Sequence, residues 1–337
     1  MPSMQNWVNE ISVEEFDIVE FLNGEYQSPQ VVRGLVSDWP LVVSALDGSN
    51  VFREYLGRYA VDRPVTVYQA PASAKGRIFY NESQTGFNFE RMQLPFGEFF
   101  NRLDELANVS EPDTLYMGST MLDHWFPGIR DCNDIEFNGM DTLVSLWLGN
   151  QTLVAPHFDF PENLACVVSG TRKFTLFAPD QIANLYPGSI DFTPSGQPIS
   201  MVDTREPDLD EFPNFTIAQN QAQHAELKPG DAIYIPSMWW HQVDSFDSHS
   251  ALVNYWWRVT PPYLGSPLLA LKHSLMVFSG LPESQKESWK QLFNYYLFDA
   301  NKRSFEYIDS AAKGVLGELS KDDVTQIKKQ LIHFLKA

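Results

Sequence analysis

The sequence predicts a mainly β protein, a sandwich or barrel with flanking helices, followed by a helical C-terminal segment. Between residues 141 and 260, short apolar or alternating runs are separated by Gly, Pro and Asn. Many short strands divided by turn residues are typical of sandwiches and barrels. Beyond residue 262 the spacing of apolar residues becomes helical. The expected helices lie at residues 268–278, 283–298, 304–319 and 322–335.

Helices and strands alternate in the first part of the chain. Helical spacing is found at residues 13–23, 52–56 and 89–103, and strand patterns at 30–36, 65–68 and 114–117. Six further strands are expected at residues 143–148, 153–158, 164–168, 173–177, 232–235 and 251–257. We therefore expect two parts, with the β domain in residues 1–265 and the helical segment in residues 266–337.

The composition of the chain indicates which kinds of partner and which cellular location to expect. With 44% hydrophobic and 14% aromatic residues, a chain of 337 residues can bury a sizeable core. A formal net charge of −19 opposes binding to phosphate backbones, so we expect no nucleic-acid partner. The chain has two cysteines, an acidic start without a signal-peptide pattern, and no apolar run of membrane-spanning length. These features predict a cytoplasmic protein without a membrane partner.

Two motifs carry the chemistry. Pro156-His157-Phe158-Asp159 places a histidine and a carboxylate two residues apart, so on a β-strand both side chains leave the same face. Further along, Ile235-Pro236 closes a strand and an aromatic pair leads to His241. Two imidazoles and one carboxylate form the facial triad of non-haem Fe(II) oxygenases, which leaves positions open for oxygen and a co-substrate. We predict that His157, Asp159 and His241 bind Fe(II) and form the catalytic centre.

These motifs and their surroundings resemble the JmjC and cupin-8 group of Fe(II)- and 2-oxoglutarate-dependent oxygenases, and within it the asparaginyl hydroxylases. The resemblance covers residues 25 to 262. It implies a double-stranded β-helix, the cupin-type jelly roll, in which residues 1–265 form the catalytic domain. The similar segments are Ala155 to Asp159, Asn163, Gly170 to Pro179, Ile235 to His241, Val253 to Trp256 and Arg33 to Pro40.

The resemblance also implies roles for residues beyond the triad. Arg172 falls where relatives place a lysine that binds the distal carboxylate of 2-oxoglutarate, and Tyr116 matches a tyrosine that helps to hold this carboxylate. Asn163 and Asn254 match asparagines that line the co-substrate site, and Trp256 matches an aromatic residue behind them. The implied cofactors are therefore Fe(II), 2-oxoglutarate as co-substrate, and O2.

Two positions depart from the family pattern. A threonine expected three residues before the first histidine is Val154, so one hydrogen bond to the co-substrate is missing or comes from elsewhere. The lysine position holds Arg172, with Lys173 beside it. If Phe174 points inward, strand alternation turns Arg172 inward as well and Lys173 toward solvent. Because arginine can bind a carboxylate with two parallel hydrogen bonds, we favour Arg172 as the anchor.

The predicted activity is hydroxylation of a C–H bond in a protein side chain, an amino acid or a small metabolite. The reaction would be coupled to conversion of 2-oxoglutarate to succinate and CO2. Two alternatives stay open. One is a cupin that binds metal or ligand without turnover, and the other is a cupin-type dioxygenase or isomerase that does not use 2-oxoglutarate. A basic residue at Arg172, beside an intact triad, favours the oxygenase over both.

The helical tail predicts a contact surface. Its helices carry more apolar side chains than a short helix normally exposes. This surface is either the seam of a homodimer through the C-terminal helices, as the resemblance implies, or an intrachain core. The residues concerned are Leu292, Phe293, Tyr296, Leu297 and Phe298.

Overall fold

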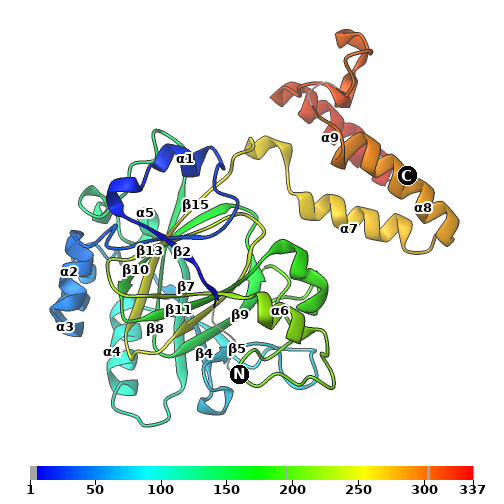
Figure 1. Ribbon diagram of the computed structural model, residues 1–337. Coiled ribbons are helices and arrows are strands. Elements are labelled where there is room, and N and C mark those ends of the chain that lie inside the picture. The colour runs from blue at the N-terminus through cyan, green and yellow to red at the C-terminus, as the bar shows by residue number, and fades with distance from the viewer. Residues whose placement is uncertain (1–5, 195, 302–303, 337) are drawn as a thin grey trace. The chain divides into compact units, whose positions relative to one another are not determined.

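The computed structural model describes residues 6–194, 196–301 and 304–336 of the chain (Figure 1). The chain divides into two compact units, Met1–Val259 and Thr260–Ala337. The domain division expected from the sequence, between residues 265 and 266, stays a prediction. Among the described helices, none is both long and apolar enough to cross a membrane.

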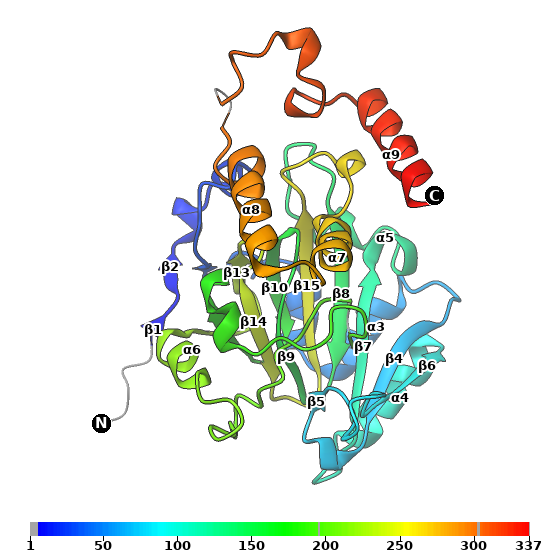
Figure 2. The same ribbon diagram turned by 90° about the vertical axis from the view of Figure 1, so that its right-hand side faces the viewer.

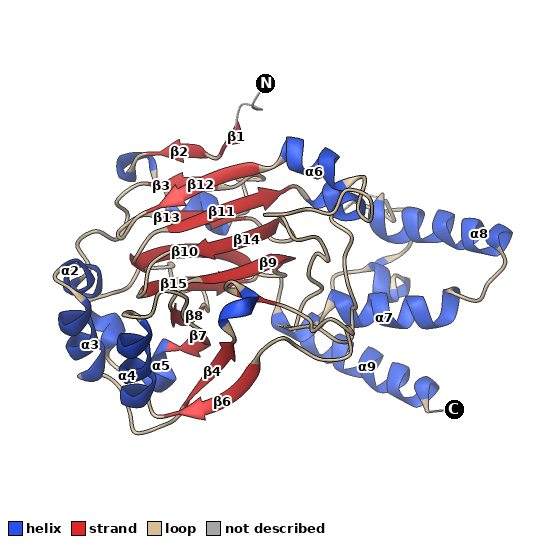
Figure 3. Ribbon diagram, turned by 90° about the horizontal axis from the view of Figure 1, so that it is seen from below, coloured by secondary structure: helices blue, strands red, loops and turns tan. Residues whose placement is uncertain are grey.

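The first unit is built from two β-sheets in which most neighbouring strands run antiparallel (Figure 3). The first sheet contains, in order, β1 (Asn6–Trp7), β12 (Gln223–Leu227), β11 (Arg172–Phe177), β14 (Trp240–Ser245), β9 (Thr152–Phe158) and β5 (Arg77–Ile78). The second contains β2 (Asn9–Ile11), β3 (Gln30–Val32), β13 (Ala232–Ile235), β10 (Glu162–Ser169), β15 (Ser250–Trp257), β8 (Leu143–Gly149), β7 (Thr114–Met121), β4 (Val65–Ala70) and β6 (Glu90–Leu94). The predicted mainly β fold with flanking helices is confirmed.

Two apolar cores hold the layers of this unit together. One lies between the sheets, where Phe174 and Leu176 of β11 pack with Ala165 and Val167 of β10. The other lies on the opposite face of the second sheet, beneath three helices. These helices are α2 (Pro40–Leu46), α3 (Ser49–Gly57) and α4 (Phe96–Leu106). The order of layers is therefore helices, sheet, sheet. Shorter helices elsewhere in the unit are α1 (Ile18–Leu22), α5 (Leu122–Trp125) and α6 (Phe215–Gln221).

One predicted helix, at residues 89–103, is wrong in its first part. This part forms β6, which pairs with β4, and α4 begins only at Phe96. Pro95 separates the two elements and precedes the first turn of α4. Proline has no backbone donor for a strand ladder and is tolerated at the start of a helix, so the change of structure falls at this residue.

Besides the two-residue strands β1 and β5, two longer strands of the first sheet, β12 and β14, were not expected from the sequence. Both are rich in polar residues, and β14 reads Trp-His-Gln-Val-Asp-Ser. Two of its polar side chains are nevertheless hydrogen-bonded within the fold, since Gln242 accepts a hydrogen bond from Thr204 and donates one to Asp244. A pattern based on apolar alternation cannot detect a strand whose outward face is hydrogen-bonded to neighbouring segments.

The second unit is helical, as predicted (Figure 2). It contains α7 (Pro267–Phe278), α8 (Glu283–Phe293), which continues as a π-helical turn at Asn294–Phe298, and α9 (Lys321–Leu335). The helix expected at 304–319 is wrong, because this segment forms only short 3-10 turns at Ser310–Ala312 and Gly314–Leu316. Gly314 has a positive φ of 51°, which interrupts any helix there.

Gly149, at the end of β8, gives the first prediction. A Cβ at this position would lie 2.6 Å from the Leu115 carbonyl oxygen and 3.1 Å from the Tyr116 Cα, both backbone atoms. Because the backbone cannot move aside easily, Gly149→Ala should lower the free energy of unfolding by about 1–3 kcal/mol in denaturant titration. Gly97→Ala is the control. Its Cβ would meet no atom within 4 Å, so it should stabilise α4 by about 0.5–1 kcal/mol. Equal effects of the two changes would contradict this packing.

Candidate functional site

The three predicted metal ligands come together at one end of the first sheet. His157 of β9 lies directly opposite His241 of β14 in an antiparallel pair, and the centroids of the two rings are 4.3 Å apart. Asp159 follows the end of β9, with its Oδ2 3.6 Å from Nε2 of His241. One ligand atom of each residue lies within 4.8 Å of the others. This spacing is compatible with a single shared ion.

Both imidazoles are held in the form that binds a metal. Nδ1 of His157 donates to the Ala155 carbonyl at 2.9 Å, and Nδ1 of His241 donates to the Trp239 carbonyl at 3.0 Å. A carbonyl oxygen only accepts, so Nδ1 carries the proton and Nε2 presents a lone pair. Burial, with a smaller effect of the neighbouring His157, lowers the pKa of His241 to about 4 and favours the neutral ring. Two neutral imidazoles and a carboxylate fit Fe(II).

A turn ties the two halves of the triad together. The Met238 backbone nitrogen donates to the Asp159 carbonyl at 2.9 Å, which links the segment before His241 to the segment after β9. The buried Glu162 carboxylate accepts hydrogen bonds from the Ser237 backbone nitrogen at 3.0 Å and from the Tyr234 hydroxyl at 2.7 Å. The relative position of Asp159 and His241 is therefore fixed by one backbone hydrogen bond and by the contacts of the Glu162 carboxylate.

All residues predicted for metal and co-substrate binding line one cavity between the two sheets, with a volume of about 90 Å³. They reach it from different elements, namely β7, β9 and the segment that follows it, β10, β11, β14 and β15. Apolar side chains complete the walls. The predicted residues are His157, Asp159, His241, Arg172, Tyr116, Asn163, Asn254 and Trp256, and the cavity is completed by Trp147, Val154, Ala165, Phe174, Val243 and Leu252.

Arg172 is the buried charge of this cavity, with only 2% of its surface exposed. Its Nε donates to the Ser250 hydroxyl at 3.1 Å and its Nη2 to the Ser250 carbonyl at 3.3 Å. Within the described residues, no carboxylate forms an ion pair with it. Burial lowers the pKa of Arg172, and the adjacent Tyr116 partly opposes this shift. Lys173 is partly exposed and does not line the cavity.

Tyr116 lies beside this guanidinium at the base of the cavity. Burial raises the pKa of its hydroxyl to about 12, although Arg172 acts in the opposite direction. The hydroxyl is therefore protonated at neutral pH and can donate a hydrogen bond. Val154 also faces the cavity, and its apolar side chain offers no hydrogen bond in place of the threonine expected from the family pattern.

Two residues of the site were missed by the sequence analysis. Ser250 holds Arg172, and Trp147 donates from its indole nitrogen to the Asn254 Oδ1 at 2.7 Å. Each is remote in sequence from its partner, and no motif surrounds it. The only signal available was that Trp147 carries a polar N–H in a mostly apolar predicted strand, which requires an acceptor if the ring is buried.

Comparison with known proteins agrees with this geometry. Residues 23–262 match the family model described as the cupin-like domain. The chain belongs to this family. The predicted membership of the JmjC and cupin-like group, and with it the jelly-roll fold, is therefore confirmed. The narrower resemblance to asparaginyl hydroxylases stays a prediction.

Two of the three relatives described here have a JmjC-type name. The chain is 27% identical to "Lysine-specific demethylase JMJ31" of Arabidopsis thaliana over 296 residues, which cover 76% of this chain and 50% of that protein. It is 28% identical to "Jumonji C domain-containing protein 5" of Drosophila melanogaster, covering 73% and 58%. It is 26% identical to human "HSPB1-associated protein 1", covering 71% and 49%. The chain thus spans about half the length of the curated relatives it matches.

Removal of the carboxylate ligand gives the second prediction. In Asp159→Ala, affinity for Co(II), used as an air-stable substitute for Fe(II), should fall by roughly 100-fold or more in titration calorimetry. His224→Ala is a matched control, because this histidine lies on β12 outside the cavity, near the Thr175 hydroxyl. Wild-type affinity in Asp159→Ala, or a comparable loss in His224→Ala, would contradict the assignment of the triad.

Proposed function

We propose that this protein is an Fe(II)- and 2-oxoglutarate-dependent oxygenase that hydroxylates a C–H bond and releases succinate and CO2. The observation that carries the proposal is the buried Arg172 guanidinium. It faces the cavity of the triad and, within the described residues, has no acidic partner. An uncompensated buried charge is costly, and the distal carboxylate of a bound 2-oxo acid would neutralise it. A cavity that only held a metal ion would not require this charge.

Different residues of the cavity would bind the metal ion and the co-substrate. His157, Asp159 and His241 would hold Fe(II), which supplies the redox chemistry that couples O2 to the decarboxylation. Arg172 and Tyr116 would bind the distal carboxylate of 2-oxoglutarate, as the resemblance implies. The remaining predicted residues, Asn163, Asn254 and Trp256, would bind the co-substrate from the walls of the cavity.

The apolar part of the wall has a separate role. Val154, Phe174, Val243 and Leu252 surround the polar groups and leave little room for water. Exclusion of water strengthens the interaction between a guanidinium and a carboxylate, and it protects reactive species from solvent.

For the substrate, we propose a protein side chain. The relatives described as a lysine-specific demethylase and as a protein associated with HSPB1 favour a protein over a free amino acid or a small metabolite. The net charge of −19 remains unfavourable for a nucleic-acid substrate. A cytoplasmic location stays part of the proposal.

Turnover of 2-oxoglutarate gives the third prediction. Purified protein with Fe(II), ascorbate and O2 should release succinate from 2-oxoglutarate, and His157→Ala should not. Arg172→Met should raise the KM for 2-oxoglutarate by about 10–100-fold, because hydrogen bonds to charged groups contribute about 1.5–3 kcal/mol.

Lys173→Met is the matched control and should leave this KM unchanged, since Lys173 lies outside the cavity. The reverse ranking of the two variants would exclude Arg172 as the anchor. Equal succinate release by wild type and His157→Ala would favour a binding protein without turnover. Oxidation of a substrate in the absence of 2-oxoglutarate would favour the cupin-type dioxygenase.

We further propose that the C-terminal unit forms a homodimer. Among its described residues, only Phe305 and Val324 are buried apolar side chains. Of the seam predicted from the sequence, Leu297 and Phe298 are 61% and 71% exposed, whereas Phe293 contacts Phe278 within the unit. So small a core does not stabilise an isolated helical unit of this length.

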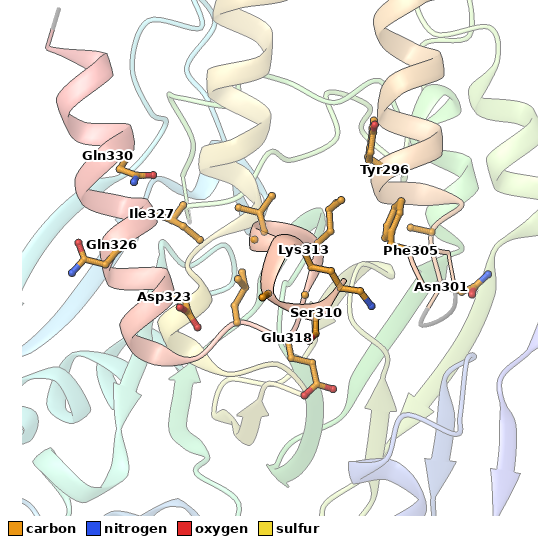
Figure 4. A pocket seen from close by; sticks show the side chains of 17 residues that line it. Tyr296, Asn301, Phe305, Ser310, Lys313, Glu318, Asp323, Gln326, Ile327 and Gln330 are labelled. Atoms are coloured by element: carbon orange, nitrogen blue, oxygen red, sulfur yellow. The ribbon is translucent and has the colours of Figure 1, made fainter. Parts of the chain in front are cut away.

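A hollow within the same unit supports this proposal. It has a volume of about 1080 Å³ and opens between the end of the π-helical turn, the turns at 310–316 and α9. Figure 4 shows Tyr296 and Phe305 on one wall and Gln326, Ile327 and Gln330 on the opposite wall. A second copy of the unit would fill the hollow and cover the exposed apolar side chains.

Disruption of this seam gives the fourth prediction. The double change Leu297→Asp and Phe298→Asp should convert a dimer into a monomer in size-exclusion chromatography with light scattering, because carboxylates cannot be buried unpaired in an apolar interface. Val109→Asp is the control, as it introduces a carboxylate at an exposed apolar position of the first unit. An unchanged dimer in the double variant, or a monomeric wild type, would exclude the seam.

A further inference from the structure

Trp147, on β8, contacts three other residues that line the cavity. Its indole nitrogen donates to Asn254 at 2.7 Å. Its ring stacks on Tyr116, with 6.2 Å between centroids and an angle of 24°, and meets Trp256 edge-to-face at 5.7 Å and 82°. The ring itself is only partly buried and lines the cavity. Trp147 therefore joins three of the residues assigned to the co-substrate.

The contact with Asn254 determines the orientation of two amides. An indole N–H can only donate, so Asn254 must turn its Oδ1 toward Trp147. Its Nδ2 then points away and donates to Oδ1 of Asn163 at 3.3 Å. With its oxygen occupied in this way, Asn163, which lines the cavity, has its own amide N–H group left for a ligand. Within the described residues, no protein acceptor receives this N–H group.

The other uncharged polar groups of the cavity are also donors. The Tyr116 hydroxyl faces a guanidinium, which cannot accept a hydrogen bond. The indole nitrogen of Trp256 is buried and has no acceptor within the described residues. Apart from the triad, four residues that line the cavity thus have N–H or O–H groups to donate, namely Arg172, Tyr116, Asn163 and Trp256.

We propose that Trp147 is a positioning residue that sets this donor-only polarity and thereby makes the cavity selective for an anion rich in acceptor oxygens, a dicarboxylate 2-oxo acid. Without the indole N–H, the Asn254 amide can rotate and reverse the dipole of Asn163. An amide oxygen would then face a carboxylate or keto oxygen of the ligand, which is repulsive. The inference rests on the proposed function and extends it to a residue that touches neither the metal ligands nor Arg172.

The fifth prediction tests this role with Trp147→Phe, which keeps one aromatic ring toward Tyr116 and Trp256 and removes the donor together with the second ring of the indole. In the Co(II)-loaded protein, without turnover, the Kd for 2-oxoglutarate should rise by about tenfold in titration calorimetry. The affinity for Co(II) itself should not change, since the hydrogen bond and the ring contacts of Trp147 within the described residues involve Asn254, Tyr116 and Trp256 and not the triad. Trp125→Phe is the control, because it removes an indole donor that binds the Pro64 carbonyl outside the cavity.

A double-mutant cycle separates positioning from simple packing. If Trp147 acts through Asn254, the pair Trp147→Phe and Asn254→Ala should bind 2-oxoglutarate no more weakly than Asn254→Ala alone. Multiplicative effects of the two changes would overturn the assignment, as would loss of Co(II) binding in Trp147→Phe or an unchanged Kd for 2-oxoglutarate. Failure of the wild-type protein to bind 2-oxoglutarate would instead overturn the proposed function and this inference together.

Discussion

The antiparallel register of β9 and β14 is the constraint on which the rest of the site depends. It places His157 opposite His241, and a slip of one residue would turn one of the two imidazoles to the other face of the sheet. The register is held from outside the cavity. Trp240, next to His241, contacts Phe158 edge-to-face at 4.9 Å within a buried aromatic cluster. Packing on the far side of the sheet therefore determines the geometry of the metal ligands.

A β-bulge between β9 and β14 turns an additional residue of β9 toward the cavity. Between the pairs His241–His157 and Val243–Val154, β14 advances by two residues and β9 by three. The extra residue lies at Ala155–Pro156, where proline has no N–H to lose from the ladder. The bulge allows Val154 and His157 to face the cavity together, although their odd separation would place them on opposite faces of a regular strand. This explains how a position three residues before the first histidine reaches the cavity.

The sequence was informative where function depends on short spacing and uninformative where it depends on distant pairing. The parity of His157 and Asp159, and the inward turn of Arg172, follow from strand alternation within a few residues. Trp147 and Asn254 are separated by 107 positions, so only the pairing of β8 with β15 reveals their contact. The strand β14 escaped detection because its polar residues are paired with neighbouring segments. The segment at 304–319 has the apolar spacing of a helix, but Gly314 has a positive φ that interrupts a helix. The spacing of apolar residues does not reveal such a backbone conformation.

The cavity presents a buried positive charge and hydrogen-bond donors, whereas the chain as a whole is strongly negative. The ligand we propose, a dianionic 2-oxo acid, would be repelled at long range by a protein of net charge −19, so electrostatic steering cannot supply its affinity. The favourable interactions must be short-ranged and preorganised, and they must lie where water is excluded. Arg172 fixed by Ser250, and two amides oriented in series by one indole, satisfy this requirement, because each donor is already held before the ligand arrives. In our proposal, the selectivity of this cavity for its ligand thus depends on the orientation of the Asn254 and Asn163 amides.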